Sequence, residues 1–322
     1  MKKRVAAGVA ACVLALGLLA GCNGGEKTIG MGGENSRNPD GIANWDGQDF
    51  AADGSAGQAG DVNGSGSPAF GEETEIQVFI AASLHTVMTS LAEEFHREYP
   101  QVHIIFNADS SGTLMNQIQE GYECDIFFPA AQKQMDTLES GGFLVEGTRA
   151  DVLNNQVVVV TAKDSGTQVT GLKDIGKAES IALAGGSVPV GRYTRQALVS
   201  LGMLPAAEDA AAVTTAQVSE ALGGVEISEQ DNVSKVLIAV TEGSCEVGTT
   251  YYSDTYGQEE KLDILEYVSY ELTGNVIYPI SLVKNSEADE AQSAAARLFY
   301  AFLLSDKARK IFDSYYFDTN VK

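Results

Sequence analysis

Two turns that contain serine carry the residues best suited to binding an anion. Ser83 follows an apolar run, residues 76–82, and precedes apolar residues at helical spacing. Ser111 lies in the hydroxyl-rich run 109–113, again before a short helical pattern. Serine is a common helix N-cap, and the unpaired N–H groups and dipole of a helix start attract negative charge. We therefore expect an anion site here, while each serine taken alone is also explained as a simple cap.

A nucleophile with its base is the competing interpretation of the first turn, because His85 lies two residues after Ser83. Two residues this close at a helix start need not face each other, and no G-x-S-x-G context surrounds the serine. The other histidines, His96 and His103, have no second cluster of metal ligands at zinc spacing. We expect no enzyme activity and no resident cofactor, with a hydrolase that uses Ser83 as the less favoured alternative.

Composition limits the classes of partner. The chain has 322 residues, 44% of them hydrophobic and 20% charged, which suits a globular protein of one large or two ordinary domains. Its formal net charge of -23 opposes binding to nucleic acid or to an anionic membrane surface through charge. An anion can still bind where local dipoles, rather than net charge, form the site.

The N-terminus has the layout of an export signal. Three basic residues, at positions 2–4, precede an apolar run at 5–20 that is short for a membrane span. The run ends in Leu-Leu-Ala-Gly-Cys22, which resembles the lipobox of bacterial lipoproteins. We expect a signal peptide at 1–21 and a lipid anchor on Cys22 that holds the protein on the extracytoplasmic face of the cell membrane. A simple secretion signal or an uncleaved anchor is the alternative.

The segment after Cys22 is rich in Gly, Asn, Asp and Ser and has too few apolar residues to form a core. We interpret 22–74 as a flexible tether.

Two cysteines remain in the folded part. Cys124 and Cys245 each precede a separate predicted strand, and although an exported protein can pair them, we favour two unpaired, half-buried thiols.

Beyond the tether, strands and helices alternate, with a strand predicted at 102–106 after the opening strand and helix. This alternation is typical of a parallel α/β sheet. The valine-rich strand 156–162 is predicted to lead into a second lobe, and the strand 276–283 to return to the first. We expect lobe 1 at 75–154 plus 276–322 and lobe 2 at 155–275, each with a mainly parallel sheet flanked by helices. The region 205–231 is less regular, and 288–317 is predicted to be helical with Ala294, Leu298, Phe302 and Leu303 facing inward. Ligands bind at the carboxyl ends of such strands, which favours a cleft between the lobes.

The order of short motifs in the folded region resembles the ModA-type molybdate-binding proteins of bacterial ABC uptake transporters. The matching pieces are Ala-Ala-Ser-Leu at 81–84, Ser-Ser-Gly-Thr-Leu at 110–114, Asp-Ile-Phe at 125–127, Ala-Gln-Lys-Gln-Met-Asp at 131–136, Ser-Val-Pro-Val-Gly-Arg-Tyr at 187–193, Val-Gly-Thr-Thr-Tyr at 247–251 and Tyr-Pro at 278–279. The resemblance implies a two-lobed, periplasmic-binding-protein-like (class II) fold that closes over a tetrahedral oxyanion.

Residue by residue, the resemblance implies five contacts to the oxyanion. They are the hydroxyls of Ser83, Ser111 and Tyr251, the backbone N–H of Val190, and a contact at the helix start, Val233. A shift of one residue would exchange Ser111 with Ser110, or Tyr251 with Tyr252, and the placement of Val233 depends on an insertion before it.

The residue types suit a ligand without protons. Molybdate is a dianion that carries no proton at neutral pH, so its oxygens need donors only. A phosphate site would gain from an acceptor, and none of the five matched positions is a carboxylate. We expect molybdate and also tungstate as ligands, with sulfate or phosphate as alternatives and an adhesin or sensor without oxyanion affinity as a third class. The resemblance also implies a monomer that delivers its ligand to an ABC permease with its ATPase subunit, without nucleic acid.

Overall fold

The computed structural model describes residues 73–321, and every structural statement below concerns that part of the chain. These residues fall within one compact unit, residues 59–322. The predictions for the signal peptide (1–21), for Cys22 and for all but the end of the tether (22–74) lie outside the described residues. In residues 73–321, the helices are all too short or too polar to cross a membrane.

The first lobe is built on a five-stranded sheet in the order β2-β1-β3-β10-β4. Its strands are β1 (Thr74–Ala81), β2 (Val102–Asp109), β3 (Ile126–Phe128), β4 (Ala150–Asn155) and β10 (Val276–Leu282). β1 pairs in parallel with β2 and β3, whereas β10 pairs antiparallel with β3 and β4. Half of the pairings are therefore antiparallel.

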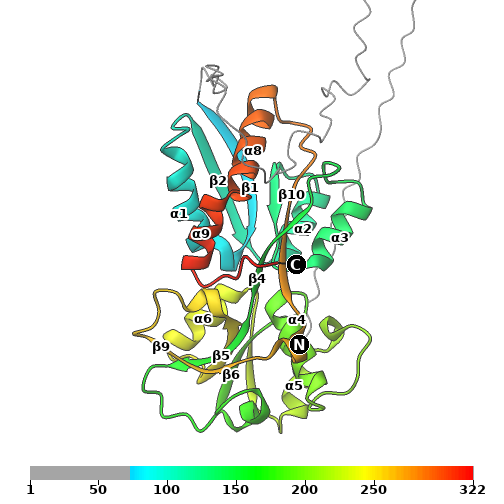
Figure 1. Cartoon of the computed structure of the whole chain (residues 1–322). Coiled ribbons are helices and arrows are strands. Elements are labelled where there is room, and N and C mark those ends of the chain that lie inside the picture. Colours follow the sequence, from blue (N-terminus) through cyan, green and yellow to red (C-terminus); the bar gives the residue numbers. More distant parts are fainter. Residues whose placement is uncertain (1–72, 322) are drawn as a thin grey trace, which may run out of the picture. The chain divides into compact units, whose positions relative to one another are not determined.

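Helices cover both faces of this sheet. They are η1 (Ala82–Leu84), α1 (His85–His96), α2 (Ser111–Gln119), α3 (Gln132–Ser140), α8 (Glu290–Leu303) and α9 (Asp306–Ser314). Figure 1 shows α1, α8 and α9 on one side and α2 and α3 on the other. Successive side chains of a strand point to opposite faces, so β1 serves both layers. Ile76, Val78 and Ile80 join the core under α1, while Phe79 joins the smaller core under α2 and α3.

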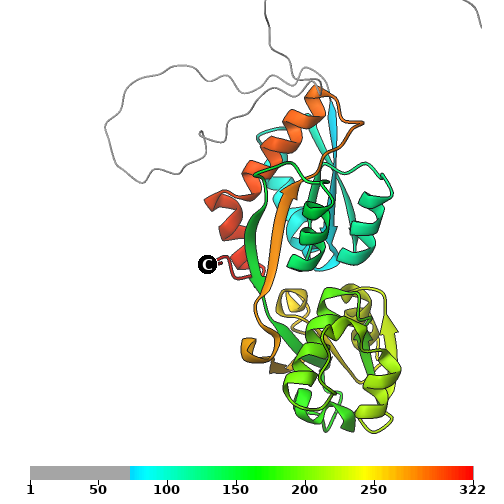
Figure 2. The same ribbon diagram turned by 90° about the vertical axis from the view of Figure 1, so that its right-hand side faces the viewer.

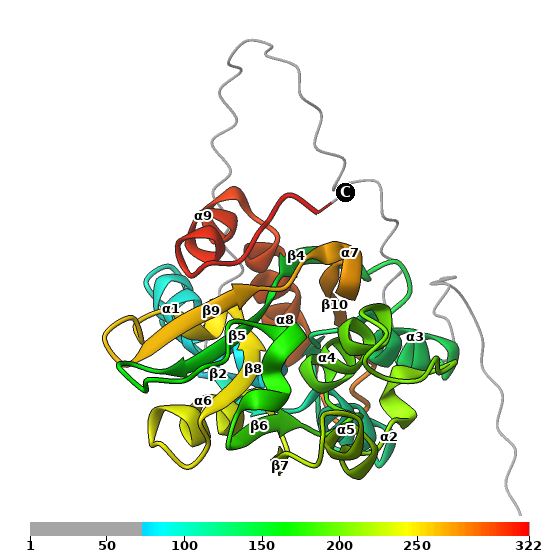
Figure 3. The same ribbon diagram turned by 90° about the horizontal axis from the view of Figure 1, so that it is seen from below.

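The second lobe has its own five-stranded sheet in the order β7-β6-β8-β5-β9. Its strands are β5 (Val157–Ala162), β6 (Ser180–Ala184), β7 (Glu226–Gln230), β8 (Val247–Tyr251) and β9 (Leu262–Tyr267). The helices are η2 (Leu172–Lys177), α4 (Pro189–Ser200), η3 (Ala210–Ala212), α5 (Thr215–Ala221), α6 (Val233–Thr241), η4 (Tyr252–Thr255) and α7 (Tyr270–Thr273). Figure 3 shows α6 on one side of the sheet and α4 and α5 on the other. The predicted two-lobed α/β fold is confirmed.

The chain passes between the lobes twice, from β4 to β5 and from α7 to β10 (Figure 2). Two buried asparagines tie these passages together. The side-chain oxygen of Asn154 accepts from the backbone N–H of Val276 at 2.9 Å. The amide of Asn155 donates to Ser253 Oγ at 2.8 Å and to Tyr278 Oη at 3.1 Å. These side chains link the two lobes at the passage, in the position of a hinge.

Several local predictions need correction. The sheets are mixed rather than mainly parallel. β10, which returns from the second lobe, pairs antiparallel with β3 and β4, and β5, which enters from the first lobe, pairs antiparallel with β8 and β9. β4 and β7 were not predicted, and the strand predicted at 102–106 continues to Asp109. The C-terminal helical region is two helices, since Ser305 caps the start of α9. The buried residues of α8 are Ala295, Ala296, Phe299 and Leu303, so the predicted inward face was partly wrong.

The two cysteines of the described region are free, as expected, but they are fully rather than half buried. Cys124 is 1% exposed and Cys245 is 4% exposed. Each precedes a central strand, β3 or β8, of a different sheet, so the strands themselves hold the two thiols in separate cores. Burial raises the pKa of the Cys124 thiol well above its ordinary value, which makes this thiol inert.

Candidate anion-binding site

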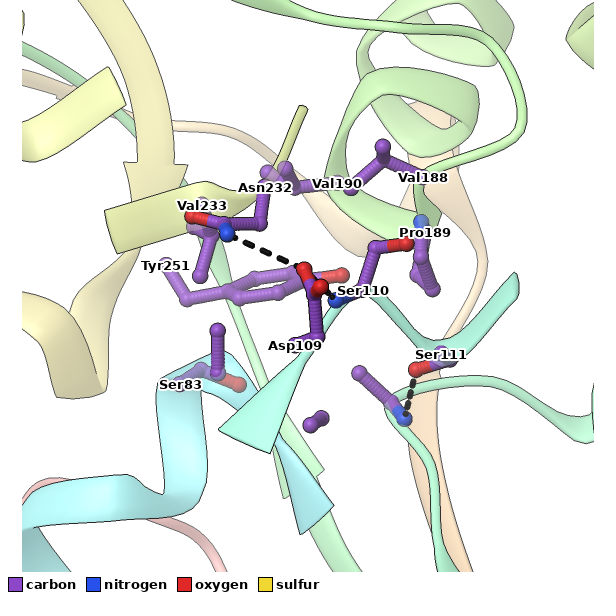
Figure 4. A pocket seen from close by; sticks show the side chains of 13 residues that line it. Ser83, Asp109, Ser110, Ser111, Val188, Pro189, Val190, Asn232, Val233 and Tyr251 are labelled. Atoms are coloured by element: carbon purple, nitrogen blue, oxygen red, sulfur yellow. Dashed lines mark hydrogen bonds between the residues drawn. The ribbon is translucent and has the colours of Figure 1, made fainter. Parts of the chain in front are cut away.

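A small pocket lies where the starts of four helical segments from both lobes meet. The lining residues are Ala81, Ala82, Ser83, Asp109, Ser110, Ser111, Ala130, Val188, Pro189, Val190, Asn232, Val233 and Tyr251 (Figure 4). The cavity has a volume of about 10 Å³. Drug-sized organic ligands occupy pockets of roughly 300–1,000 Å³, so the pocket is too small for a sugar or a peptide. All five residues predicted to contact the anion lie on its wall.

Ser83 is positioned differently from the prediction. It lies inside the short turn η1 instead of capping a helix, and α1 begins only at His85. Its hydroxyl oxygen is 2.9 Å from that of Tyr278. Because Asn155 already donates to Tyr278 Oη, the Tyr278 hydrogen finds its acceptor in Ser83 Oγ. The hydrogen of Ser83 is then left for a ligand.

The second serine turn separates two roles that sequence left open. Ser110 is the N-cap of α2, and its hydroxyl oxygen accepts from the backbone N–H of Thr113 at 3.2 Å. Ser111 follows as the first helical residue, and its Oγ accepts from the backbone N–H of Ala130 at 2.9 Å. Ser111 is 1% exposed. Its hydroxyl hydrogen is thus available to the pocket, while the hydroxyl of Ser110 serves the helix.

Tyr251 carries an unsatisfied hydroxyl on the pocket wall. Its side chain is 1% exposed, and its Oη has no hydrogen-bond partner among the described residues. Burial raises the pKa of this hydroxyl well above its ordinary value, so it stays protonated and able to donate. A buried polar atom without a partner is costly unless something pairs with it. Tyr252, the alternative by one residue, instead stacks on Tyr316 with ring centroids 4.7 Å apart.

Asp254 fixes the backbone behind Tyr251. Its Oδ2 accepts from the backbone N–H of Tyr251 at 3.0 Å and from Thr250 Oγ1 at 2.7 Å. Burial raises the pKa of this carboxyl to about 6. The carboxylate holds the start of η4 and thereby the direction of the Tyr251 ring.

Two helix starts from the second lobe face the serines. Val190 is the second residue of α4, after Pro189, and the α4 N-cap Val188 offers no side-chain acceptor. Val233 is the first residue of α6, whose cap Asn232 accepts from the N–H of Lys235. The N–H groups of a helix's first turn have no partner within the helix, so Val190 and Val233 present backbone donors. Nearby, a Cβ on Gly191 would overlap the carbonyl oxygens of Ala184 and Gly185, which explains the glycine.

A fully buried arginine anchors this part of the second lobe, and the sequence interpretation missed it. Arg195 is 0% exposed. Its guanidinium donates to the carbonyls of Val213, Ala184 and Gly191 at 2.7 to 2.9 Å and to Thr215 Oγ1 at 3.0 Å. These bonds join α4 to the end of β6 and to the loop after η3, so Arg195 holds the α4 start at the pocket.

Two further pocket residues, Asp109 and Asn232, are not among the five predicted contacts. Asp109 ends β2 and lies on the pocket wall, so the predicted absence of a carboxylate holds only for the five contact positions. Asn232 does cap α6, but its amide also donates to Asp109 Oδ1 at 3.1 Å. The predicted strand ended at Phe106, three residues too early, which hid Asp109 at a strand end, where sheets of this kind place ligand-binding residues.

The geometry does not support the pairing of Ser83 with His85. Ser83 is buried and bonded to Tyr278, whereas the His85 side chain is exposed on the first turn of α1. In residues 73–321, no group of three or more His, Cys, Asp or Glu side chains is placed to hold a metal ion. The pocket wall offers hydroxyl and backbone N–H donors, which are the groups that can bind the oxygens of a small anion.

Comparison with known proteins defines the class. Residues 76–318 match the family described as "Bacterial extracellular solute-binding protein". The match covers most of the chain, and the protein belongs to this family.

Two similar proteins and one solved structure show which members of the family this chain resembles. The YvgL protein of Bacillus subtilis, named as an ABC transporter substrate-binding lipoprotein, is 26% identical over 247 residues, with 76% of this chain and 87% of YvgL covered. The molybdate-binding protein ModA of Haemophilus influenzae is 25% identical over 257 residues, with 77% and 91% covered. A solved substrate-binding domain assigned to a molybdenum ABC transporter of Clostridium difficile is 30% identical, with a TM-score of 0.55, and covers 77% of this chain and all of that domain. The resemblance to ModA-type proteins is confirmed.

Proposed function

We propose that this protein captures molybdate, and also tungstate, outside the cytoplasm and delivers it to an ABC permease driven by an ATPase subunit. The observation that carries the proposal is the state of the hydroxyls at the pocket. Ser83 and Ser111 accept from the scaffold, and Tyr251 Oη has no partner in the described region. Three hydroxyl hydrogens are thus free for a ligand, which suits an oxyanion that carries no proton.

The helix starts support the same ligand. Backbone N–H groups at Val190 and Val233 add donors, and the dipoles of α2, α4 and α6 point their positive ends at the pocket. The five residues Ser83, Ser111, Val190, Val233 and Tyr251 are our proposed contacts. The relatives named for molybdate or molybdenum support molybdate as the ligand.

Phosphate is the second candidate because of Asp109. Its Oδ1 accepts from Ser110 and from Asn232, which leaves Oδ2 as an acceptor for the proton that a phosphate carries at neutral pH. Sulfate has no such proton, so the choice between sulfate and molybdate depends on the size of the anion.

We propose that lipid on Cys22 anchors the protein to the extracytoplasmic face of the cell membrane and that the protein is a monomer. The relative YvgL is named a lipoprotein, which agrees with the lipobox-like sequence before Cys22.

We also propose that this protein is not an enzyme. Incubation with ester and phosphoester substrates is expected to give no turnover that Ser83→Ala abolishes.

Calorimetric titration with molybdate, tungstate, sulfate and phosphate tests the function. Molybdate and tungstate are expected to bind, and Ser111→Ala is expected to weaken both by about 1–3 kcal/mol through loss of a donor to a charged oxygen. Ser281→Ala is the matched control, because Ser281 is another buried serine of the same lobe that bonds to Thr148 away from the pocket. Preferential binding of phosphate would favour the second candidate, and no binding of any oxyanion would favour an adhesin or sensor.

A further inference from the structure

The single charged side chain among the described residues on the pocket wall has the wrong sign for an anion site. Asp109 ends β2 in the first lobe, and its Oδ1 accepts from the backbone N–H of Ser110 at 2.7 Å. A carboxylate beside a dianion weakens binding through like-charge repulsion. The cation Lys235, on the first turn of α6, forms its ion pair with Asp231 at 2.5 Å and not with Asp109. The position of Asp109 therefore calls for a reason other than contact with a dianion.

The structure supplies that reason in Asn232. This residue caps α6 in the second lobe, and its Nδ2 donates to the same Asp109 Oδ1 at 3.1 Å, a bond that spans the pocket (Figure 4). Both ends are held rigidly. The oxygen of Asn232 accepts from the N–H of Lys235, while Asp109 is tied to Ser110, the cap of α2. Two short side chains thus connect the α2 start to the α6 start.

We propose that Asp109 and Asn232 are a positioning pair that joins the two walls of the anion site. The bond sets the distance between the Ser111 hydroxyl in one lobe and the Val233 N–H in the other. The charge of Asp109 lowers the affinity for a dianion, so the same residue both aligns the site and limits how tightly it holds its ligand. This inference rests on the proposed oxyanion function, while the bond itself does not require a ligand.

Other contacts between the lobes lie beside the pair. Lys133 of α3 pairs with Asp209, the cap of η3, at 2.5 Å, with side chains 50% and 41% exposed. Ion pairs between exposed side chains contribute little to the stability of a folded protein. A Cβ on Gly112 would lie 3.3 Å from the carbonyl oxygen of Ser187, so the lobes already touch there. The Asp109–Asn232 bond differs from these contacts because it lies on the pocket wall itself.

A set of substitutions separates the bond from the charge. Asn232→Asp keeps a good N-cap but sets two carboxylates against each other, and we expect molybdate binding to weaken by at least about tenfold. Asp109→Asn keeps an acceptor for Ser110 and Asn232 and removes the charge, so molybdate is expected to bind several-fold more tightly than in the unmodified protein. The double variant restores a donor and an acceptor with the roles exchanged, and we expect most of the affinity to return.

Amide hydrogen exchange of the ligand-free full chain, read by mass spectrometry, gives a measure that does not depend on the ligand. Peptides that contain residues 110–113 and 232–235 are expected to exchange faster in Asn232→Asp than in the unmodified protein and to slow again in the double variant. If exchange in Asn232→Asp is unchanged, or if the double variant is as fast as the single one, the pair does not join the walls. If Asp109→Asn binds molybdate no more tightly, the charge effect is wrong. Failure of the proposed ligand alone would leave the exchange pattern intact.

Discussion

The hydroxyl oxygen of Tyr278 lies 2.9 Å from Ser83 Oγ and connects a passage between the lobes to the pocket. Tyr278 lies on β10, the strand that returns to the first lobe, and it also accepts from Asn155 on the other passage. The same contacts that tie the two passages together thus orient a proposed ligand donor. A change in the hinge would alter the direction of the Ser83 hydroxyl.

Replacement of Tyr278 by phenylalanine tests this connection. Tyr278→Phe removes the partner of Ser83 Oγ and is expected to weaken molybdate binding by about 0.5–1.5 kcal/mol, the usual net value of one hydrogen bond. Calorimetry gives the affinity, and thermal unfolding gives the stability. Tyr300→Phe is the control, because that hydroxyl bonds to the Thr148 carbonyl away from the pocket. It is expected to cost similar stability without loss of affinity, and equal affinity in both variants would contradict the connection.

Removal of the unpartnered hydroxyl of Tyr251 is expected to have opposite effects on stability and on binding. Without ligand, Tyr251→Phe relieves a buried polar atom that lacks a partner, so the free energy of unfolding should stay equal or rise by about 1 kcal/mol. With molybdate, binding should weaken by about 1–3 kcal/mol, because a donor to a charged oxygen is lost. Thermal unfolding with and without molybdate measures both. Tyr252→Phe, whose ring stacks on Tyr316, should leave binding unchanged. A loss of affinity in Tyr252→Phe without a loss in Tyr251→Phe would shift the contact to Tyr252.

The buried carboxyl of Asp254 is expected to make stability depend on pH. Burial raises its pKa to about 6 in the folded protein from an ordinary value of 3.8. The raised pKa means that the folded protein favours the protonated carboxyl. The contribution of this group to the free energy of unfolding is therefore complete below about pH 4 and is lost as the pH rises through about 6. The shift corresponds to at most about 3 kcal/mol, since the residue keeps some exposure.

Asp254→Asn keeps an acceptor for Tyr251 and removes this titration. The free energy of unfolding, measured from pH 4 to pH 8, should rise in the variant relative to the unmodified protein as the pH increases. Asp209→Asn is a control of opposite sign, because the bond from Lys133 lowers the pKa of Asp209. That carboxylate stabilises the folded state above its unfolded pKa and loses the effect as the pH falls. A constant difference between Asp254→Asn and the unmodified protein would show that Asp254 does not titrate in this range.

Arg195 is expected to be the residue of the second lobe least tolerant of a conservative change. Arg195→Lys cannot reproduce four guanidinium bonds in fixed directions, and it leaves buried carbonyls unpaired. Stability should fall by at least about 3 kcal/mol in chemical denaturation. Arg192→Lys, on the more exposed neighbouring position with an ion pair of 3.6 Å to Asp209, should change stability by less than about 1 kcal/mol. Equal effects would mean that the buried bonds of Arg195 contribute little.

Local patterns in the chain were enough for the class of fold. Alternating apolar strands and amphipathic helices predicted two α/β lobes with two passages between them, because burial of apolar faces depends mainly on nearby residues. The order of motifs predicted the solute-binding family. It also named Ser83, Ser111, Val190, Val233 and Tyr251, which the structure places on one pocket wall.

What the sequence determined by itself is therefore the family and the residue types at the site, whereas the tertiary structure decided which hydroxyls are free. Ser110 and Ser111 are alike in sequence, and only the contact of Ser111 with Ala130, 19 residues away, separates their roles. The orientation of Ser83 depends on Tyr278, 195 residues away. The bond from Asn232 to Asp109 spans 123 residues. Hydrogen bonds of this kind depend on how the two lobes meet, and no local pattern in the chain contains that information.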